Sequence, residues 1–344
     1  MPRENKYNLS IIIPVYNEEK YLELLFRDIE KHFNYDDVEV IVVNDGSYDD
    51  SGNILTKLKK NSYKFEYKLI TLKRNFGKGF AVKEGAKNST GKYLLLLDAD
   101  LELDIKDSKE IYEIISNDEE IDCIFGSRYL SGKLKKHNYF FNELIGKLNT
   151  FIFNLFFGQS LSDIHCGLKI FSRDVYNKIN LSVNDFGLEI DIAAQIIKNN
   201  YFIYEVGVSY FSRTVKAGKK ITWVDGLKSY YYLFKARFLD NSTSTLISII
   251  ISPIYMTYVG SYFGMGLGNI LFMTIFFLIG LIIGLHTKII SSMSIFLIIY
   301  LGSLFGNGQG KVLFVLFFFL FGIYMVNKIR KKVKRNYPNL TYLF

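Results

Sequence analysis

The sequence predicts an α/β domain with a mostly parallel sheet, followed by an all-α region of four membrane-spanning helices. Short apolar runs alternate with helical stretches over roughly the first 240 residues, which is typical of such a sheet. Residues 241–327 are then almost uncharged, with Lys288 and Lys311 as their two charged side chains. This length accommodates four spans of a bilayer, each of about 20 residues.

Four apolar runs in the first part predict the strands of the sheet, at residues 9–16, 38–44, 67–72 and 93–98. Each run is rich in β-branched residues or leucine and ends at a turn residue or an acidic residue. The stretch 18–33 between the first two runs has apolar residues near helical spacing. Because ligands of parallel sheets bind beyond the carboxyl ends of the strands, the polar residues after these runs should converge on one crevice.

Two aspartates follow the fourth strand and should face that crevice. Asp98 and Asp100 leave a run of leucines, and ionised carboxylates at such a position are costly unless they meet a cation. Oxygen ligands of this kind suit Mg²⁺ or Mn²⁺, with Glu102 as a third ligand. A solvated acidic loop is the alternative for an isolated Asp-x-Asp pair. The polar clusters at 14–18 and 44–47, which follow the first two strands, favour the metal site.

The net charge of +8 is a signal of topology, because it is confined to the apolar third. The chain has 42 basic and 34 acidic residues, and beyond residue 245 there are eight basic residues and no acidic ones. The first part is therefore neutral, which argues against a nucleic-acid binder with a basic face. The 30 Phe and 25 Tyr exclude a disordered chain, and the two cysteines exclude a disulfide scaffold.

The four spans are expected at about 246–263, 268–285, 289–306 and 311–327, followed by a basic tail at 328–344. Basic flanks stay on the cytoplasmic side, so the tail and the first domain are both predicted to be cytoplasmic. We therefore expect a multi-pass integral membrane protein, of the plasma membrane in a prokaryote or of the endoplasmic reticulum in a eukaryote. The spans lack Asp, Glu and Arg, which favours an anchor, or a surface for homo-oligomers, over a transporter.

Two further segments are expected to lie on the membrane surface. Residues 139–157 have a wide apolar face at helical spacing and flanking lysines, as an interfacial helix does. Residues 223–240, just before the first span, have a similar pattern. A helix in the protein core is the alternative for either segment. The α/β domain is accordingly placed at residues 1–222.

Several short motifs, taken together, resemble family 2 glycosyltransferases of the GT-A fold. Within that family they are most similar to the polyprenyl-phosphate glycosyltransferases, which include the mannosyl- and glucosyltransferases of dolichyl phosphate. The resemblance extends over about residues 9–238 and rests on the set, not on any single motif. The motifs are IIIPVYNE at 11–18, VVNDGSYD at 42–49, NFGKG at 75–79, DAD at 98–100, GSRY at 126–129, CGLKIF at 166–171, GLEID at 187–191, and Arg213 with GKK at 218–220.

The resemblance implies a role for each matching position. The nucleotide sugar would contact Pro14, Tyr16, Asn17, Glu18, Val43, Asp45, Asn75, Lys78, Gly79, Asp98, Ala99, Asp100 and Arg128. The metal would bind Asp98, Asp100 and Glu102. The acceptor phosphate would bind Arg128, Arg213 and Lys219. Catalysis would involve Asp100, Arg128, Glu189 and Asp191, although acids like the last two are also common at a helix N-terminus.

The sequence departs from the family pattern at three positions. Glu102 stands where relatives often have Gln as a metal ligand, and Asn44 replaces a usual Asp. Asn142 stands near a position where relatives often have an Arg that binds phosphate. The lysines that could substitute for that Arg are Lys135, Lys136 and Lys147.

The implied reaction is the inverting transfer of a hexose from a nucleotide sugar to dolichyl or undecaprenyl phosphate. A divalent cation and cationic side chains would offset the repulsion between the negatively charged reactants. GDP-mannose, UDP-glucose and UDP-N-acetylglucosamine are all open as donors. A non-catalytic, membrane-tethered nucleotide-sugar binder is one alternative. A processive polysaccharide synthase is disfavoured, because the single tryptophan, Trp223, lacks a Gln-x-x-Arg-Trp-type motif.

Overall fold

The structure is a computed structural model of the 344-residue chain, and it describes residues 6–33, 35–130, 132–136, 140–214 and 223–239. The chain divides into two compact units, Met1–Ala236 and Arg237–Phe344, and the fold described below is that of the first unit together with the described residues 237–239. The predicted spans, the basic tail and Lys219 lie outside the described residues.

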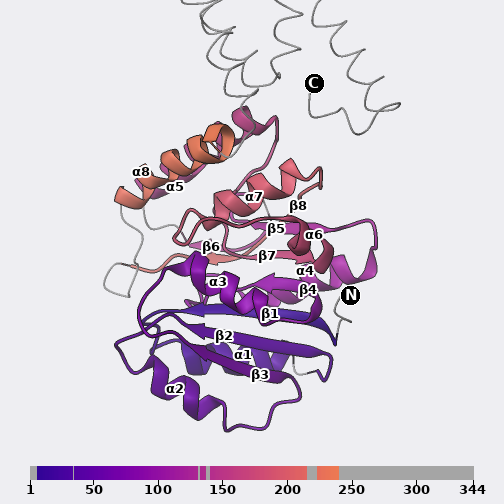
Figure 1. The fold of residues 1–344 in the computed structure, drawn as a ribbon, viewed down its shortest axis with the longest axis vertical. Helices are drawn as coiled ribbons and strands as arrows, with labels where there is room; N and C mark the ends of the chain where they lie inside the picture. The colour runs from indigo at the N-terminus through magenta and orange to yellow at the C-terminus, as the bar shows by residue number, and fades with distance from the viewer. Residues whose placement is uncertain (1–5, 34, 131, 137–139, 215–222, 240–344) are drawn as a thin grey trace, which may run out of the picture. The chain divides into compact units, whose positions relative to one another are not determined.

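The first unit is built around a seven-stranded mixed sheet (Figure 1). Its strands, and those of a small second sheet, are β1 (Tyr7–Val15), β2 (Val38–Asn44), β3 (Glu66–Thr71), β4 (Gly91–Leu96), β5 (Cys123–Ser127), β6 (Lys135–Lys136), β7 (Lys169–Ser172), β8 (Tyr204–Gly207) and β9 (Tyr210–Phe211). The large sheet has the order β3-β2-β1-β4-β7-β5-β8, and β6 pairs with β9. β1 to β4 form a parallel set, as predicted, whereas β7 runs antiparallel to both β4 and β5.

Helices cover both faces of this sheet (Figure 1). They are α1 (Leu22–Phe33), α2 (Ser51–Leu58), α3 (Lys78–Lys87), α4 (Ile105–Asn117), α5 (Phe140–Phe157), α6 (Arg173–Lys178), α7 (Leu188–Lys198), α8 (Trp223–Phe234) and a π-helical turn, η2 (Lys235–Leu239). Along β1, Leu9, Ile11 and Ile13 join the apolar cluster that contains α1, α2 and α4, while Ile12 joins the cluster of α3 and α5 to α8. This alternation is the period of two of a strand buried on both faces.

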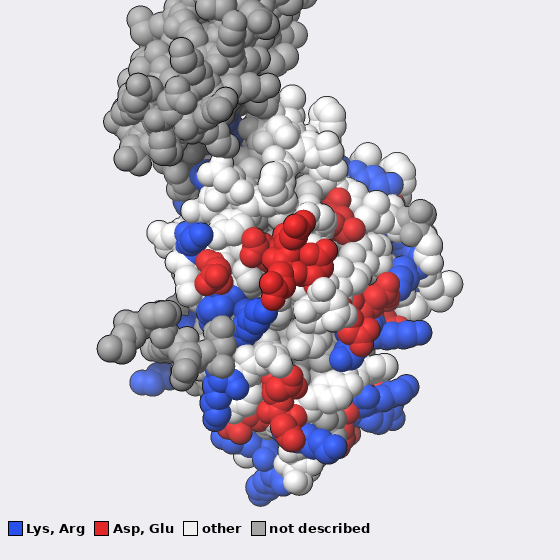
Figure 2. Space-filling view, turned by 90° about the vertical axis from the view of Figure 1, so that its right-hand side faces the viewer, with Lys and Arg blue, Asp and Glu red and all other residues white. Residues whose placement is uncertain are grey.

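The predicted strands are confirmed to within two residues at each end. The first predicted helix begins later than expected, at Leu22, and it buries Leu22, Leu25, Phe26, Ile29 and Phe33 against the sheet. On the face shown in Figure 2, acidic and basic side chains are both present, in keeping with the neutral balance predicted for this part of the chain.

α5 buries two polar residues together with a phenylalanine and exposes several large apolar residues on its other side. The helix forms over nearly the predicted range, and its buried residues are Asn149, Thr150 and Phe153. In the described parts of the chain, no helix combines the length and the apolar character that crossing a membrane requires. The location of α5 and α8 on a membrane surface stays a prediction. The exposed apolar side chains of α5 are Phe140, Phe141, Leu144, Leu148, Phe151 and Leu155.

Candidate active site

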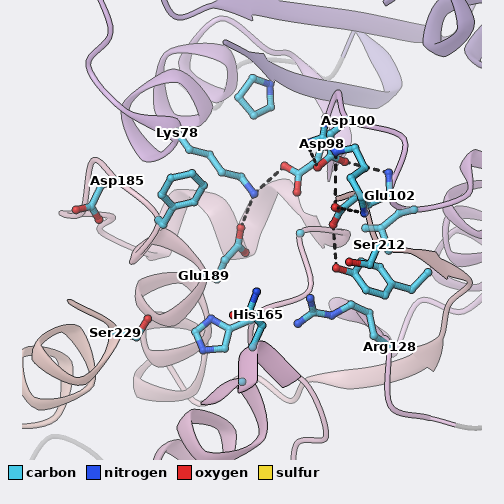
Figure 3. Close-up of a pocket in the computed structure, with 18 of the residues that line it drawn as sticks. Lys78, Asp98, Asp100, Glu102, Arg128, His165, Asp185, Glu189, Ser212 and Ser229 are labelled. Atoms are coloured by element: carbon cyan, nitrogen blue, oxygen red, sulfur yellow. Dashed lines mark hydrogen bonds and ion pairs between the residues drawn. The ribbon is translucent and has the colours of Figure 1, made fainter. Parts of the chain in front are cut away.

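A cleft of about 560 Å³ lies at the carboxyl ends of β1, β2 and β4 (Figure 3). The parallel register aligns these ends, because Val15 pairs with Asn44 and Ile12 pairs with Leu96. The residues that follow each strand therefore reach the same cleft, among them Asp45 and Asp98. The predicted convergence of the strand ends is confirmed.

Most of the residues implied by the resemblance line this cleft. Asn17, Val43, Gly79 and Asp191 are not among its lining residues, and Lys219 is not described. The predicted residues that line the cleft are Pro14, Tyr16, Glu18, Asp45, Asn75, Lys78, Asp98, Ala99, Asp100, Glu102, Arg128, Glu189 and Arg213.

Gly79 and Asp191 support the loop before α7 instead of lining the cleft. Asp191 Oδ2 accepts hydrogen bonds from the backbone N–H groups of Ser182, at 2.7 Å, and Val183, at 3.0 Å. A Cβ atom on Gly79 would lie 2.5 Å from the carbonyl oxygen of Val183, so the helix and the loop can approach this closely only at a glycine. The structure thus places both residues behind the cleft wall, and their direct contacts with a substrate stay a prediction.

Asn17 and Val43 also lie outside the cleft lining. Val43 is buried in a small apolar cluster with Ile41 and Ala81. Asn17 has a φ of 52°, and its Oδ1 accepts a hydrogen bond of 3.0 Å from the backbone N–H of Tyr48. Asn17 therefore ties together the loops that follow β1 and β2.

Arg213 lies among three carboxylates of the cleft. Its Nη1 is 2.8 Å from Glu18 Oε2, and its Nη2 is 2.9 Å from Asp100 Oδ2. Its backbone N–H donates to Glu102 Oε1 at 2.8 Å, and the Tyr210 hydroxyl donates to Glu102 Oε2 at 2.9 Å. The residue predicted to bind the acceptor phosphate therefore neutralises the acidic end of the cleft in this state.

Asp98 and Asp100 form the pair that could hold a divalent cation. Burial and the charge of Asp98 raise the pKa of the Asp100 carboxyl to about 7, which marks negative charge that its surroundings do not fully offset. Paired carboxylates are ligands that suit Mg²⁺ or Mn²⁺. Among the described residues, however, no three His, Cys, Asp or Glu side chains are grouped as a metal site, and Glu102 is bonded to Arg213 and Tyr210. All three carboxylates line the cleft, and their binding of a metal stays a prediction.

Lys78 bridges two carboxylates that line the cleft, those of Asp98 and Glu189 (Figure 3). Its Nζ lies 2.7 Å from Asp98 Oδ1 and 2.8 Å from Glu189 Oε1. Burial alone would lower the pKa of Lys78, but the two carboxylates raise it above its ordinary value. Burial alone would raise the pKa of Glu189, whereas ion pairs with Lys169 and Lys78 lower it to about 2. Glu189 therefore stays ionised, and a carboxylate with so low a pKa is a weak proton acceptor at neutral pH.

Arg128 is held in the cleft by a residue that no motif indicated. The carboxylate of Asp163 accepts from Arg128 Nε at 2.7 Å, from Nη2 at 2.9 Å and from the backbone N–H at 3.1 Å. Burial alone would raise the pKa of Asp163, but the guanidinium holds it below its ordinary value. Asp163 lies three residues before the CGLKIF motif, and that proximity was its one signal in the sequence.

Asp45 is bound to the glycine-containing loop of NFGKG. Its two carboxylate oxygens accept from the backbone N–H groups of Phe76 and Gly77, each at 2.8 Å. Gly77 has a φ of 100°, a conformation that L side chains rarely adopt. Burial raises the pKa of Asp45 despite these hydrogen bonds. Asp45 therefore shapes the wall of the cleft in addition to lining it.

His165 and Asn149 line the cleft without a predicted role. The Nδ2 atom of Asn149 is 3.2 Å from His165 Nε2. Burial lowers the pKa of His165 to about 4, so the imidazole is neutral at physiological pH. Asn149 was concealed in the sequence by the apolar pattern of the helix around it. The other lining residues that the motifs missed include Asp185, Phe186, Tyr210, Ser212, Lys228 and Ser229.

Among Lys135, Lys136 and Lys147, only Lys135 lines the cleft, as Asn142 does. Its Nζ lies 4.3 Å from the centre of the Tyr129 ring and 3.4 Å from Glu143 Oε1. Lys147 lies 5.1 Å from the same ring and 3.0 Å from the same carboxylate oxygen. Of the three lysines considered as replacements for a phosphate-binding Arg, Lys135 is the one that lines the cleft, and its binding of phosphate stays a prediction.

Comparisons with known proteins agree with this architecture. The model of Glycosyl transferase family 2 matches residues 10–179. A dolichyl-phosphate beta-glucosyltransferase of Dictyostelium discoideum is 31% identical over 223 residues, which is 61% of this chain and 68% of that protein. The Saccharomyces cerevisiae protein of the same name is 28% identical over 242 residues, 64% of this chain and 71% of that protein. Another relative, from Trichomonas vaginalis, is matched over only 54% of its length.

A solved structure shares the fold. Glucosyl-3-phosphoglycerate synthase from Mycobacterium tuberculosis, in complex with Mn²⁺ and UDP-glucose, superposes with a TM-score of 0.53 at 15% identity. The match covers 67% of this chain and 79% of that one. At this identity the likeness concerns the fold, and it agrees with the GT-A-like sheet predicted from the motifs.

Proposed function

Because the chain belongs to glycosyl transferase family 2, we propose that it transfers glucose from UDP-glucose to a polyprenyl phosphate such as dolichyl phosphate. The glucosyl donor is supported by the names of the relatives reported above. A GDP-mannose donor and a mannosyltransferase activity, which were open on the motifs alone, gain no support from these relatives. UDP-N-acetylglucosamine is the donor to test beside UDP-glucose.

The observation that supports a lipid acceptor is the two-sided character of α5. Asn142, Glu143, Ile145, Gly146 and Asn149 on this helix line the cleft. Six large apolar side chains of the same helix, the exposed set given above, are open to solvent. A helix that forms a wall of the cleft and also exposes an apolar surface suits a substrate with a charged head and a hydrocarbon chain.

The reaction would be a single displacement at the anomeric carbon of glucose. A phosphate oxygen of the lipid attacks the anomeric carbon while the bond from that carbon to the diphosphate breaks. UDP leaves, and the configuration at the anomeric carbon is inverted in the product. A phosphate monoester is already anionic at neutral pH, so the attack needs no strong base. This agrees with a Glu189 that is held as an ion-paired carboxylate.

The main task of the protein in this reaction is to offset negative charge. Asp98 and Asp100 would hold a divalent cation, which would neutralise charge on the diphosphate. Arg128, fixed by Asp163, faces the cleft with Lys135 and supports binding of the acceptor phosphate. Arg213 is bonded to Glu18 and Asp100, so a cation at the aspartate pair would compete with it for Asp100.

The test is an assay of the full-length chain in detergent with radiolabelled UDP-glucose, GDP-mannose and UDP-N-acetylglucosamine. Each donor is mixed with Mn²⁺ and a polyprenyl phosphate, and label is counted after extraction into organic solvent. We expect lipid-linked label from UDP-glucose and its loss in Asp100→Asn. Asp118→Asn, an equal change at an exposed loop, should keep activity. Binding of UDP-glucose without lipid-linked product would instead indicate a non-catalytic binder.

A further inference from the structure

Lys169 is fully buried beside the cleft and has none of the roles assigned above. It is part of the CGLKIF motif and begins β7. Its Nζ lies 2.8 Å from Glu189 Oε2 and donates to the carbonyl oxygens of Ile164, at 3.2 Å, and Cys166. The ammonium also lies 4.5 Å from the centre of the Phe125 ring. A buried ammonium is tolerated only with partners of this kind, so its position is closely determined.

One path from Lys169 to the cleft runs through ion pairs. Glu189 contacts Lys169 with Oε2 and Lys78 with Oε1, each at 2.8 Å. Lys78 in turn lies 2.7 Å from Asp98 Oδ1. Since Lys78 is shared by two carboxylates, its place between them depends on how far Glu189 is neutralised from its other side, by Lys169.

A second path runs through the backbone. Lys169 binds the carbonyl groups of Ile164 and Cys166, and Gly167 follows in the same turn. A Cβ atom on Gly167 would lie 2.1 Å from Asp98 Oδ2, so this backbone contacts the second oxygen of the same carboxylate. Asp98, Lys78, Glu189, Lys169 and the turn at 164–167 therefore form a closed ring of contacts.

We propose that Lys169 is a positioning residue that closes this ring and thereby holds the Asp98 carboxylate in the orientation that binds the metal–diphosphate end of the donor. The inference rests on the proposed function for the identity of the ligand at Asp98. Lys169 does not contact the donor itself. It acts on Asp98 from both sides, through Glu189 and Lys78 and through Gly167. A lysine that merely neutralised a buried glutamate would affect stability and leave ligand affinity unchanged.

The test is the substitution Lys169→Met, which keeps the apolar stem and removes the ammonium. Glu189 should then draw Lys78 away from Asp98. We expect the affinity for UDP in the presence of Mn²⁺, measured by calorimetry on the full-length chain in detergent, to fall about tenfold or more, as for other residues that orient metal ligands. In the transfer assay, KM for the donor should rise more than kcat falls.

The matched control is Lys68→Met. Lys68 pairs with the fully buried Glu39 at 2.5 Å, and neither residue lines the cleft. This variant should lose stability without losing affinity for UDP and Mn²⁺. If Lys169→Met does not fold, Glu189→Gln breaks the ring at the next member with little change of shape, and the same loss of affinity is expected. If Lys169→Met folds and binds UDP with Mn²⁺ as tightly as the wild type does, the proposal is overturned.

A crystal structure of Lys169→Met without ligand separates this proposal from the proposed function. A Lys78–Asp98 separation clearly longer than the present 2.7 Å would support the ring, and an unchanged separation would overturn it. This outcome does not depend on any donor. Failure of the wild-type chain to bind UDP with Mn²⁺ would count against the proposed function, while the crystallographic comparison would still decide the role of Lys169.

Discussion

At the scale of single residues, Arg128 shows how a buried partner determines what a motif residue can do. Its guanidinium is held by two side-chain hydrogen bonds to Asp163, which is 1% exposed. Without that carboxylate, the guanidinium could turn away from the cleft or bind another acid. The motif indicated the arginine, and the aspartate sets its direction.

We predict that Asp163→Asn lowers kcat/KM for the lipid phosphate about 100-fold, because a displaced Arg128 no longer meets the phosphate. Loss of one member of this buried pair should also reduce the free energy of unfolding by about 3 kcal/mol. Initial rates and thermal unfolding measure the two effects. The control is Glu110→Gln, which removes an exposed carboxylate partner of Lys133. Its kinetics and thermal stability should stay near those of the wild type. Unchanged kinetics in Asp163→Asn would contradict the role given to Arg128.

His165 predicts a dependence of stability on pH. Burial lowers its folded-state pKa to about 4, from an ordinary value near 6.5. Between these values the unfolded chain binds a proton that the folded chain does not, so the contribution is full above about pH 6.5 and is lost as pH falls toward 4. Over this range the contribution of His165 to the free energy of unfolding changes by at most about 1.4 kcal/mol per pH unit.

We therefore expect His165→Gln to reduce the drop in Tm between pH 7 and pH 5. Glutamine can still bond to Asn149 and carries no titrating group. His32→Gln, at the end of α1 on the other side of the sheet, provides the comparison and should retain the wild-type drop. Equal drops in all three proteins would show that His165 does not govern this response.

At the scale of elements, α5 illustrates a pattern with two physical explanations. Its apolar residues were consistent with a core helix or with an interfacial one. The structure buries Asn149, Thr150 and Phe153 on the inward side and exposes Phe140, Phe141 and Phe151 on the other. The sequence pattern located the helix, but only its packing shows which side is exposed.

We predict that Phe151→Ser, on the exposed side of α5, raises KM for a long polyprenyl phosphate about tenfold. The reason is that the variant loses the free energy gained when one aromatic side chain is buried in an apolar phase. A water-soluble acceptor with a very short prenyl chain should be used equally well by the variant and the wild type. Phe202→Ser, at an exposed phenylalanine before β8, is the matched control. Equal effects of the two substitutions on the long acceptor would argue against a lipid-facing α5.

At the scale of the whole molecule, the distribution of charge predicts the topology of the part outside the described residues. Four spans between 241 and 327 and a basic tail would return the C-terminus to the side of the catalytic domain. Tags placed at residues 1 and 344 should therefore be accessible from the same side of sealed vesicles, and the chain should resist extraction by alkaline carbonate. Tags on opposite sides would exclude an even number of spans.

The strands of the parallel set and the crevice at their ends were predictable from the sequence, because hydrophobic periodicity depends on neighbouring residues alone. The insertion of β7 antiparallel to β4 was not, since a short apolar run does not specify its partner or direction. The same holds for the residues of the site. Asp98 and Asp100 were located by their strand, which places their backbone at the sheet edge.

What only the tertiary structure decided is which charges meet. The sequence contains 42 basic and 34 acidic residues, and nothing in its local pattern pairs Lys169 with Glu189 or Arg213 with Glu18. These pairs join segments far apart along the chain, and they form because burial leaves no water to satisfy either charge. The sequence by itself thus determined the four parallel strands, the acidic strand end and the family, while packing decided the partners that orient each charged group in the cleft.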